Sequence, residues 1–335
     1  MSPSRRLPRV LRLLALTALL SSSLALAAVP SASSAAKAVT PRVPAHLAVT
    51  QSAPSKLAHA AVGKPRRAKA PIATTPTHPT PWLAGVVQAP LVGPVTLYGP
   101  PSNVPLRGLA LFLSGDGGWN LGVVGMARRA ANLGLWVAGF STPEYLHALA
   151  ARPAGTCSDA AGTLTALATS LKQQLNLPAD LPVLLIGYSS GATMVYAALV
   201  QAAPHAFQGG LSLGFGPEIE TTHVFCPGAG DLAWQKSPHP PHMPSFVRNT
   251  DVSAPWHILQ GEIDEDVAPQ FATDYVAGVP GAKAWLLPYV GHGFGVPRNW
   301  APQYRAALET LLPPSPAAVL ARPAQPAKSV KSAVR

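Results

Sequence analysis

The strongest constraint on the fold is an apolar run, residues 181–186, that leads into Gly187-Tyr-Ser189-Ser-Gly191 and then into a helix-forming stretch. This arrangement is typical of a nucleophile elbow, in which a strand turns sharply into a helix and exposes a serine hydroxyl. Gly187 and Gly191 have no Cβ atom, so strand and helix can approach closely. Similar Gly/Ser patterns occur in ordinary strand–helix turns, but the flanking strand and helix favour the elbow. We therefore predict that Ser189 is a nucleophile.

A candidate acid and a candidate base follow Ser189 along the chain. The order nucleophile, acid, base is the one that a serine hydrolase with this kind of elbow requires. Residues 254–264 form an apolar strand that ends in Gly-Glu-Ile-Asp264, and residues 283–293 form another that ends in Gly-His292-Gly. Asp264 would orient the imidazole of His292, which would accept the Ser189 proton. Asp266 is the next candidate for the acid, and Glu262 lies close by.

A glycine-rich loop, Ser114-Gly-Asp-Gly-Gly-Trp119, follows an earlier apolar strand. In this type of hydrolase the corresponding loop supplies one N–H of the oxyanion hole, and the residue after the nucleophile supplies another. We therefore expect the oxyanion donors at Ser190, Gly115 and Gly117. The loop could also be a plain strand–helix connection. A phosphate-binding loop is disfavoured because no Gly-Lys-Ser/Thr motif is present.

The loop 114–119, the elbow 187–191 and Gly261-Glu-Ile-Asp264 together resemble the bacterial virulence protein family of VirJ and AcvB. The resemblance extends over about residues 84–312. It implies an α/β-hydrolase that is exported to the periplasm and hydrolyses the aminoacyl ester of lysyl-phosphatidylglycerol. It also implies that Ser189 is the nucleophile, Asp264 the acid and His292 the base.

Four residues near these motifs are candidates for substrate binding: Asp116, Trp119, Tyr145 and Tyr188. A lysyl ester carries an ammonium group, which a carboxylate would bind. We expect Asp116 or Glu144 to provide it, although Asp116 could equally be a turn residue that bonds to its own loop.

Strand-like and helix-like segments alternate along the chain, which predicts an α/β-hydrolase fold with a mainly parallel sheet and helices on both faces. The expected strands lie near residues 109–113, 135–140, 183–186, 210–213, 256–260 and 284–288. The expected helices lie near residues 121–132, 163–175, 192–203, 271–277 and 302–312. The long connection 216–255 is a candidate lid, in which Trp234, Met243 and Phe246 either line a pocket or pack on the domain.

The sequence predicts four regions. Residues 1–27 combine arginines, an apolar stretch and Ala-Leu-Ala, and thus resemble a signal peptide, with an uncleaved anchor as the alternative. Residues 28–81, rich in Ala, Pro and basic side chains, are typical of a disordered linker. Residues 82–312 form the hydrolase domain, and 313–335 a disordered tail. We expect the protein in the periplasm, with possible association with the membrane.

The net charge of +11 conceals an acidic domain. Residues 1–80 carry 11 of the 25 Lys and Arg, and residues 313–335 carry 4, which leaves 10 for the rest of the chain against all 14 acids. The basic linker could rest on an anionic membrane surface, or it could merely be a solubilising linker. A specific nucleic-acid partner is not expected. The acidic domain suits a cationic substrate.

Two cysteines, Cys157 and Cys226, would form a disulfide in an exported protein if their Cα atoms lie within range. No cofactor is expected. No metal site is expected either, because His239 and His242 lack a third ligand nearby. The sequence thus predicts a serine esterase acting on an aminoacylated lipid or another ester. The alternative is a non-catalytic envelope or secretion-associated adaptor on a hydrolase scaffold.

Overall fold

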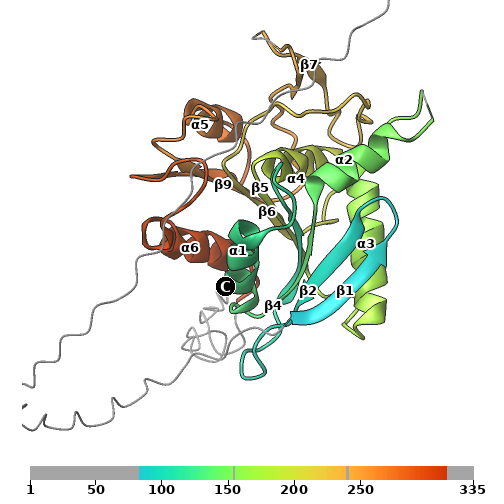
Figure 1. Cartoon of the computed structure of the whole chain (residues 1–335), viewed down its shortest axis with the longest axis vertical. Coiled ribbons are helices and arrows are strands. Elements are labelled where there is room, and N and C mark those ends of the chain that lie inside the picture. Colours follow the sequence, from blue (N-terminus) through green and yellow to red (C-terminus); the bar gives the residue numbers. More distant parts are fainter. Residues whose placement is uncertain (1–82, 154, 239–240, 315–335) are drawn as a thin grey trace, which may run out of the picture. The chain divides into compact units, whose positions relative to one another are not determined.

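The computed structural model describes residues 83–314 except 154, 239 and 240 (Figure 1). The predicted signal peptide (1–27) and linker (28–81) lie outside the described residues. So do residue 82 of the predicted domain and residues 315–335 of the tail. Within the described part of the chain, no helix is both long and apolar enough to cross a membrane.

Eight strands form one sheet in the order β1-β2-β4-β3-β5-β6-β9-β10. The six from β4 to β10 in this order are parallel, and β2 runs antiparallel to both β1 and β4. The strands are β1 Leu83–Ala89, β2 Gly93–Tyr98, β3 Gly108–Leu113, β4 Leu135–Phe140, β5 Val183–Tyr188, β6 Gly209–Leu213, β9 Trp256–Gly261 and β10 Lys283–Leu287. This is an α/β-hydrolase fold, as predicted; the β1–β2 hairpin was not foreseen.

Helices cover both faces of the sheet (Figure 1). They are α1 Leu121–Ala131, α2 Thr142–Ala150, α3 Ala160–Gln174, α4 Ser190–Gln201, α5 Gln270–Val276 and α6 Ala301–Leu311, with the short 3-10 helix η1 Pro297–Asn299. Buried side chains of α3, α4 and α5 share one core cluster, and those of α1 and α6 share another. Because both faces are covered, the central strands β3 and β9 are buried along their whole length.

Local sequence explains where three of these helices begin. The side chain of Asn120 accepts a hydrogen bond from Gly122 N at the start of α1. Asp159 does the same for Gly162 N at the start of α3, three residues earlier than the predicted start. Helix α2 was not predicted. Ser141 caps it, and Pro143 occupies its first turn, where a missing N–H costs nothing.

The long connection 216–255 contains a small hairpin of β7 Trp234–Lys236 and β8 Pro244–Phe246. Phe246 packs in the core, whereas Trp234 is exposed. A disulfide joins Cys157 to Cys226, which ties this connection to the segment before α3. The main chain is paired at the same place by the bridge between Ser158 and Phe225.

Candidate active site

The elbow at Ser189 joins β5 to α4 through a backbone that few L-residues adopt. Ser189 has φ 54° and ψ −123°, and its N–H donates to Leu213 O at 2.9 Å. A Cβ atom on Gly187 would clash with the Gly191 carbonyl, and one on Gly191 would clash with the Leu113 carbonyl. Only glycine at these two positions allows the close approach that presents the Ser189 hydroxyl.

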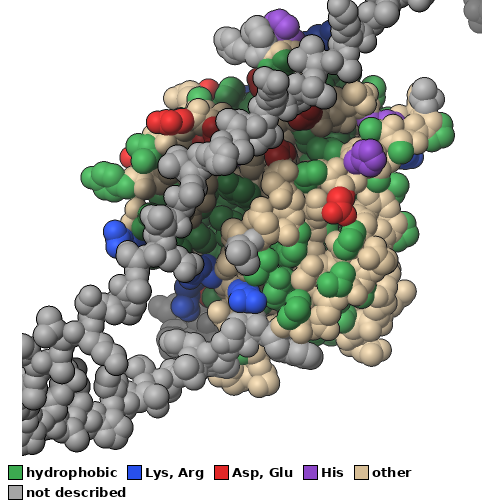
Figure 2. Space-filling view, in the orientation of Figure 1, with side chains coloured by type: hydrophobic (Ala, Val, Ile, Leu, Met, Phe, Trp, Pro, Cys, Tyr) green, Lys and Arg blue, Asp and Glu red, His purple; other side chains and the backbone are tan. Residues whose placement is uncertain are grey.

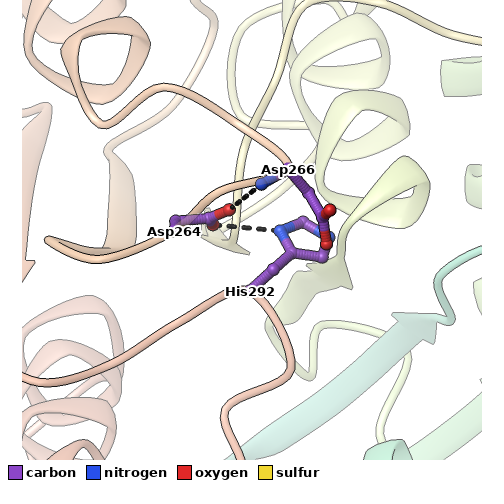
Figure 3. A group of neighbouring side chains, drawn as sticks. All are labelled: Asp264, Asp266 and His292. Atoms are coloured by element: carbon purple, nitrogen blue, oxygen red, sulfur yellow. Dashed lines mark hydrogen bonds and ion pairs between the residues drawn. The ribbon is translucent and has the colours of Figure 1, made fainter.

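Three predicted residues form a continuous chain of hydrogen bonds. His292 Nε2 lies 2.9 Å from Ser189 Oγ, and His292 Nδ1 lies 2.9 Å from Asp264 Oδ2. Figure 3 shows the carboxylate of Asp264 and the ring of His292 pointing toward each other. This arrangement fixes the tautomer in which Nδ1 donates to the carboxylate and Nε2 can accept the serine proton.

The Asp264 carboxylate is inaccessible to solvent, and its hydrogen-bond partners are all donors. Oδ1 accepts from the N–H groups of Asp266 at 3.1 Å and Val267 at 2.9 Å. Oδ2 accepts from the amide of Gln260 at 2.8 Å as well as from His292. These bonds fix the plane of the carboxylate relative to the imidazole.

Asp266, the alternative acid, contributes its main chain to this network, while its side chain is exposed. Its carboxylate lies beside the His292 ring in Figure 3. Possible ligand atoms of Asp264, Asp266 and His292 lie within 4.8 Å of one another, so these three could hold a cation. A cation on Nδ1 would displace the hydrogen bond between His292 and Asp264.

The loop 114–119 packs directly on the elbow. A Cβ atom on Gly115 would lie 3.0 Å from the Ser189 Cβ. The Gly115 carbonyl accepts hydrogen bonds from Ser114 Oγ at 2.9 Å and from Gly118 N at 3.0 Å. Asp116 and Gly117 line the pocket beside Ser189. Ser190 opens α4, where the first N–H groups lack intrahelical partners. The loop and the helix start therefore both meet at Ser189, as an oxyanion hole requires.

Tyr188 connects the elbow to the segment that carries His292. Its hydroxyl donates to the His292 carbonyl at 3.1 Å, and the two rings lie 5.6 Å apart. Burial, followed by the negative charges of Asp264, Asp266 and Asp116, raises the pKa of Tyr188. The hydroxyl therefore keeps its proton and its hydrogen bond at neutral pH.

A pocket of about 800 Å³ opens over Ser189 and His292. Asp116 and Tyr188 line it, as expected for substrate-binding residues, whereas Trp119 and Tyr145 do not. Trp119 packs edge-on against Phe112, and Tyr145 is fully buried in the core. Glu144 also lies outside the lining.

Residues 108–210 match the model of a family described as bacterial virulence protein (VirJ). The resemblance to VirJ is confirmed over this segment. It contains the loop 114–119 and the elbow, whereas Asp264 and His292 follow it. No curated protein matches the chain.

Among solved structures, an α/β serine hydrolase without lid from Xanthomonas campestris is 20% identical, with a TM-score of 0.44, and covers 72% of this chain and 100% of its own. Est1E from Butyrivibrio proteoclasticus is 13% identical, covers 69% and 99%, and has a TM-score of 0.46. A dienelactone hydrolase from Anabaena variabilis is 20% identical, covers 69% and 97%, and has a TM-score of 0.45.

Sequence reasoning missed three residues of this site. Gln260, which holds Asp264, is a polar residue near the end of the buried strand β9, and a polar side chain at that place was a usable signal. Glu218 and Glu220 line the pocket from the connection 216–255. They lie far from every catalytic motif in the sequence, so only the fold brings them to Ser189.

Proposed function

We propose that this protein is a serine esterase. The observation that carries the proposal is the hydrogen-bonded chain from Ser189 through His292 to Asp264, at 2.9 Å for each link. It supplies a nucleophile, a base and an orienting acid in the geometry that acyl transfer needs.

In this mechanism Ser189 Oγ attacks the ester carbonyl carbon while His292 Nε2 takes the serine proton. The backbone N–H of Ser190 and a donor of the loop 114–119 bind the negative charge that develops on the carbonyl oxygen. As the C–O bond breaks, His292 returns the proton to the leaving alcohol. Water, deprotonated by His292, then releases the acyl group as a carboxylic acid and restores Ser189.

We propose further that the substrate is the aminoacyl ester of lysyl-phosphatidylglycerol or a related aminoacylated lipid, and that the protein acts in the periplasm. The VirJ match over residues 108–210 supports the substrate class. The signal-like residues 1–27 support export, and the Cys157–Cys226 disulfide is of a kind that persists in oxidising compartments. The basic segment 28–81 could hold the enzyme at the anionic membrane surface where such lipids lie.

The test is to incubate the purified protein with vesicles of lysyl-, alanyl- or unmodified phosphatidylglycerol and to measure released amino acid. We expect release of lysine, and none with Ser189→Ala. A fluorophosphonate probe should label the wild type at Ser189 and leave the variant unlabelled. Lack of labelling, together with lack of turnover of every ester, would contradict the proposal of an esterase.

A further inference from the structure

Glu218 lies in the wall of the pocket and is held in place by the connection 216–255. The main chain on either side of it is paired with β8, through Ile219 N to Pro244 O and Phe246 N to Pro217 O, both at 2.9 Å. Its side chain is half-buried, and Oε1 accepts a hydrogen bond from Ser237 Oγ. The carboxylate therefore has a fixed position relative to Ser189.

This segment is also tied to the helix that carries the elbow. Thr193, in the first turns of α4, donates from Oγ1 to the Gly216 carbonyl at 2.6 Å. Thr193, Gly216 and Glu218 all line the same pocket as Ser189 and His292. The hydrogen bond from Thr193 to Gly216 thus holds the segment of Glu218 at a fixed distance from Ser189. A group bound at Glu218 would have a defined position relative to the nucleophile.

The described lining of the pocket carries several carboxylates. It includes Asp116, Glu220 and Asp266 besides Glu218, but neither Lys nor Arg. Figure 2 shows acidic side chains gathered on the upper part of the face drawn, near α5 and the connection. Within the described part of the chain, the ion pairs present do not involve Glu218.

Glu218 differs from the other three carboxylates in its surroundings. Asp116, Glu220 and Asp266 are exposed, so water and salt screen their charges. Glu218 is half-buried and lies next to the buried Ile219. A charge interacts more strongly with a ligand of opposite charge where less water lies between them.

Apolar side chains line the pocket beside Glu218. Ile219, Met243, Val267 and Phe271 belong to the same lining and offer surface for methylene groups. An acyl group that fits both features has an aliphatic chain that ends in a cation.

We propose that Glu218 is a specificity-determining residue, which binds the ammonium at the far end of an ω-amino acyl chain while Ser189 attacks the carbonyl. The inference rests on the proposed esterase function. It assigns the selection of the acyl group to the connection 216–255, in place of Asp116 or Glu144.

Two soluble esters that differ only in this group provide the kinetic test: lysine ethyl ester and norleucine ethyl ester share the four-carbon side chain. For the full-length protein, Glu218→Gln should raise KM for the lysine ester about ten- to hundred-fold, the range for losing a hydrogen bond between charged groups. KM for the norleucine ester should stay within about twofold. Glu144→Gln, the same chemical change outside the pocket, should leave both esters unaffected.

Three kinetic results would overturn the proposal: an equal loss on both esters, a wild type without preference for the lysine ester, or an effect of Glu220→Gln in place of Glu218→Gln. The first would mean that Glu218 only shapes the pocket.

A binding measurement separates this inference from the esterase proposal. Lysinamide, titrated calorimetrically into Ser189→Ala, should bind and should lose about tenfold or more in affinity when Glu218→Gln is added. If that loss appears but no ester is ever hydrolysed, the binding of the terminal ammonium by Glu218 stands and the esterase proposal fails. If esters are hydrolysed and lysinamide binding is indifferent to Glu218, the inference is wrong and the esterase proposal stands.

Discussion

Gln260 and Asp264 are joined by a hydrogen bond of 2.8 Å from the amide of one to Oδ2 of the other, the oxygen that also accepts from His292. The Gln260 Oε1 accepts in turn from Phe215 N at 2.9 Å, on the segment that leads from β6 into the pocket wall. One buried amide therefore fixes the plane of the acid and the start of the connection 216–255.

Replacing this amide should affect turnover more than binding. We expect Gln260→Met to lower kcat about 10- to 100-fold on a soluble ester while KM changes less, because Asp264 loses a donor that orients it. The orphaned Phe215 N–H should also lower the free energy of unfolding by about 1–3 kcal/mol. Steady-state kinetics and urea denaturation measure the two effects. Gln173→Met, on the exposed face of α3, is the control, and an unchanged kcat in Gln260→Met would contradict the positioning role.

Ser189 is the proposed nucleophile and also has an unfavourable backbone conformation, and two substitutions separate these two properties. Ser189→Ala should lower kcat by about 10⁴- to 10⁶-fold and leave the melting temperature nearly unchanged. Ser189→Gly should be equally inactive but should melt a few degrees higher than Ser189→Ala, because glycine tolerates φ 54° without strain. Calorimetry and ester kinetics on both variants test this; activity within tenfold of wild type in either would rule out Ser189 as the nucleophile.

The two candidate acids should respond very differently to the same substitution. Asp264→Asn should lower kcat by about 10⁴-fold, because the amide favours the wrong tautomer of His292. Asp266→Asn should change kcat far less, since it is the backbone N–H of Asp266 that supports the network. Both variants keep the size of the side chain, so their comparison by kinetics is direct. The reverse ranking would make Asp266 the acid.

Loss of the disulfide should destabilise the fold while leaving the site chemically complete. Cys157 and Cys226 are 69 residues apart in sequence. A cross-link over a loop of this length stabilises by about 2–4 kcal/mol, chiefly by restricting the unfolded chain. The double variant Cys157→Ser, Cys226→Ser should unfold at a lower urea concentration than the wild type. A reducing agent should lower the urea midpoint of the wild type by a similar amount and leave that of the variant unchanged. An unchanged midpoint in both experiments would contradict a structural role.

His257 should make stability fall in mild acid. Burial, and then the charge of Lys283, lower its pKa in the folded protein below the ordinary value of 6.5. At a pH below 6.5, His257 is protonated in the unfolded chain more readily than in the folded protein. The free energy of unfolding therefore decreases as the pH falls. We expect His257→Gln to show a shallower decrease between pH 7 and 5 than the wild type, measured by urea denaturation at each pH. Parallel curves would show that His257 does not contribute.

Several parts of the site were readable from local sequence because local chemistry dictates them. The elbow needs Gly187 and Gly191 at fixed positions around Ser189, since side chains there would clash with the main chain. Asp264 and His292 each follow an apolar strand, and the ends of parallel strands meet at one edge of a sheet. The alternation of strands and helices was also predictable, because strands that are covered on both faces are continuous apolar runs in the sequence.

Two residues that the sequence suggested for substrate binding lie outside the pocket. Trp119 and Tyr145 neighbour the motifs in sequence, yet one packs on Phe112 and the other is buried in the core. Sequence proximity does not tell which way a side chain points, because that depends on the elements packed around it.

The sequence by itself predicted the candidate nucleophile, its candidate partners in proton transfer and the class of fold, since each depends on short-range steric rules and on strand order. Only the tertiary structure decided what surrounds the nucleophile. Gln260 reaches Asp264 because the chain turns directly after β9 ends, and Glu218 reaches the pocket because its segment pairs with β8. The placement of Glu218 depends on this long-range pairing, and no local sequence pattern around Glu218 indicates it.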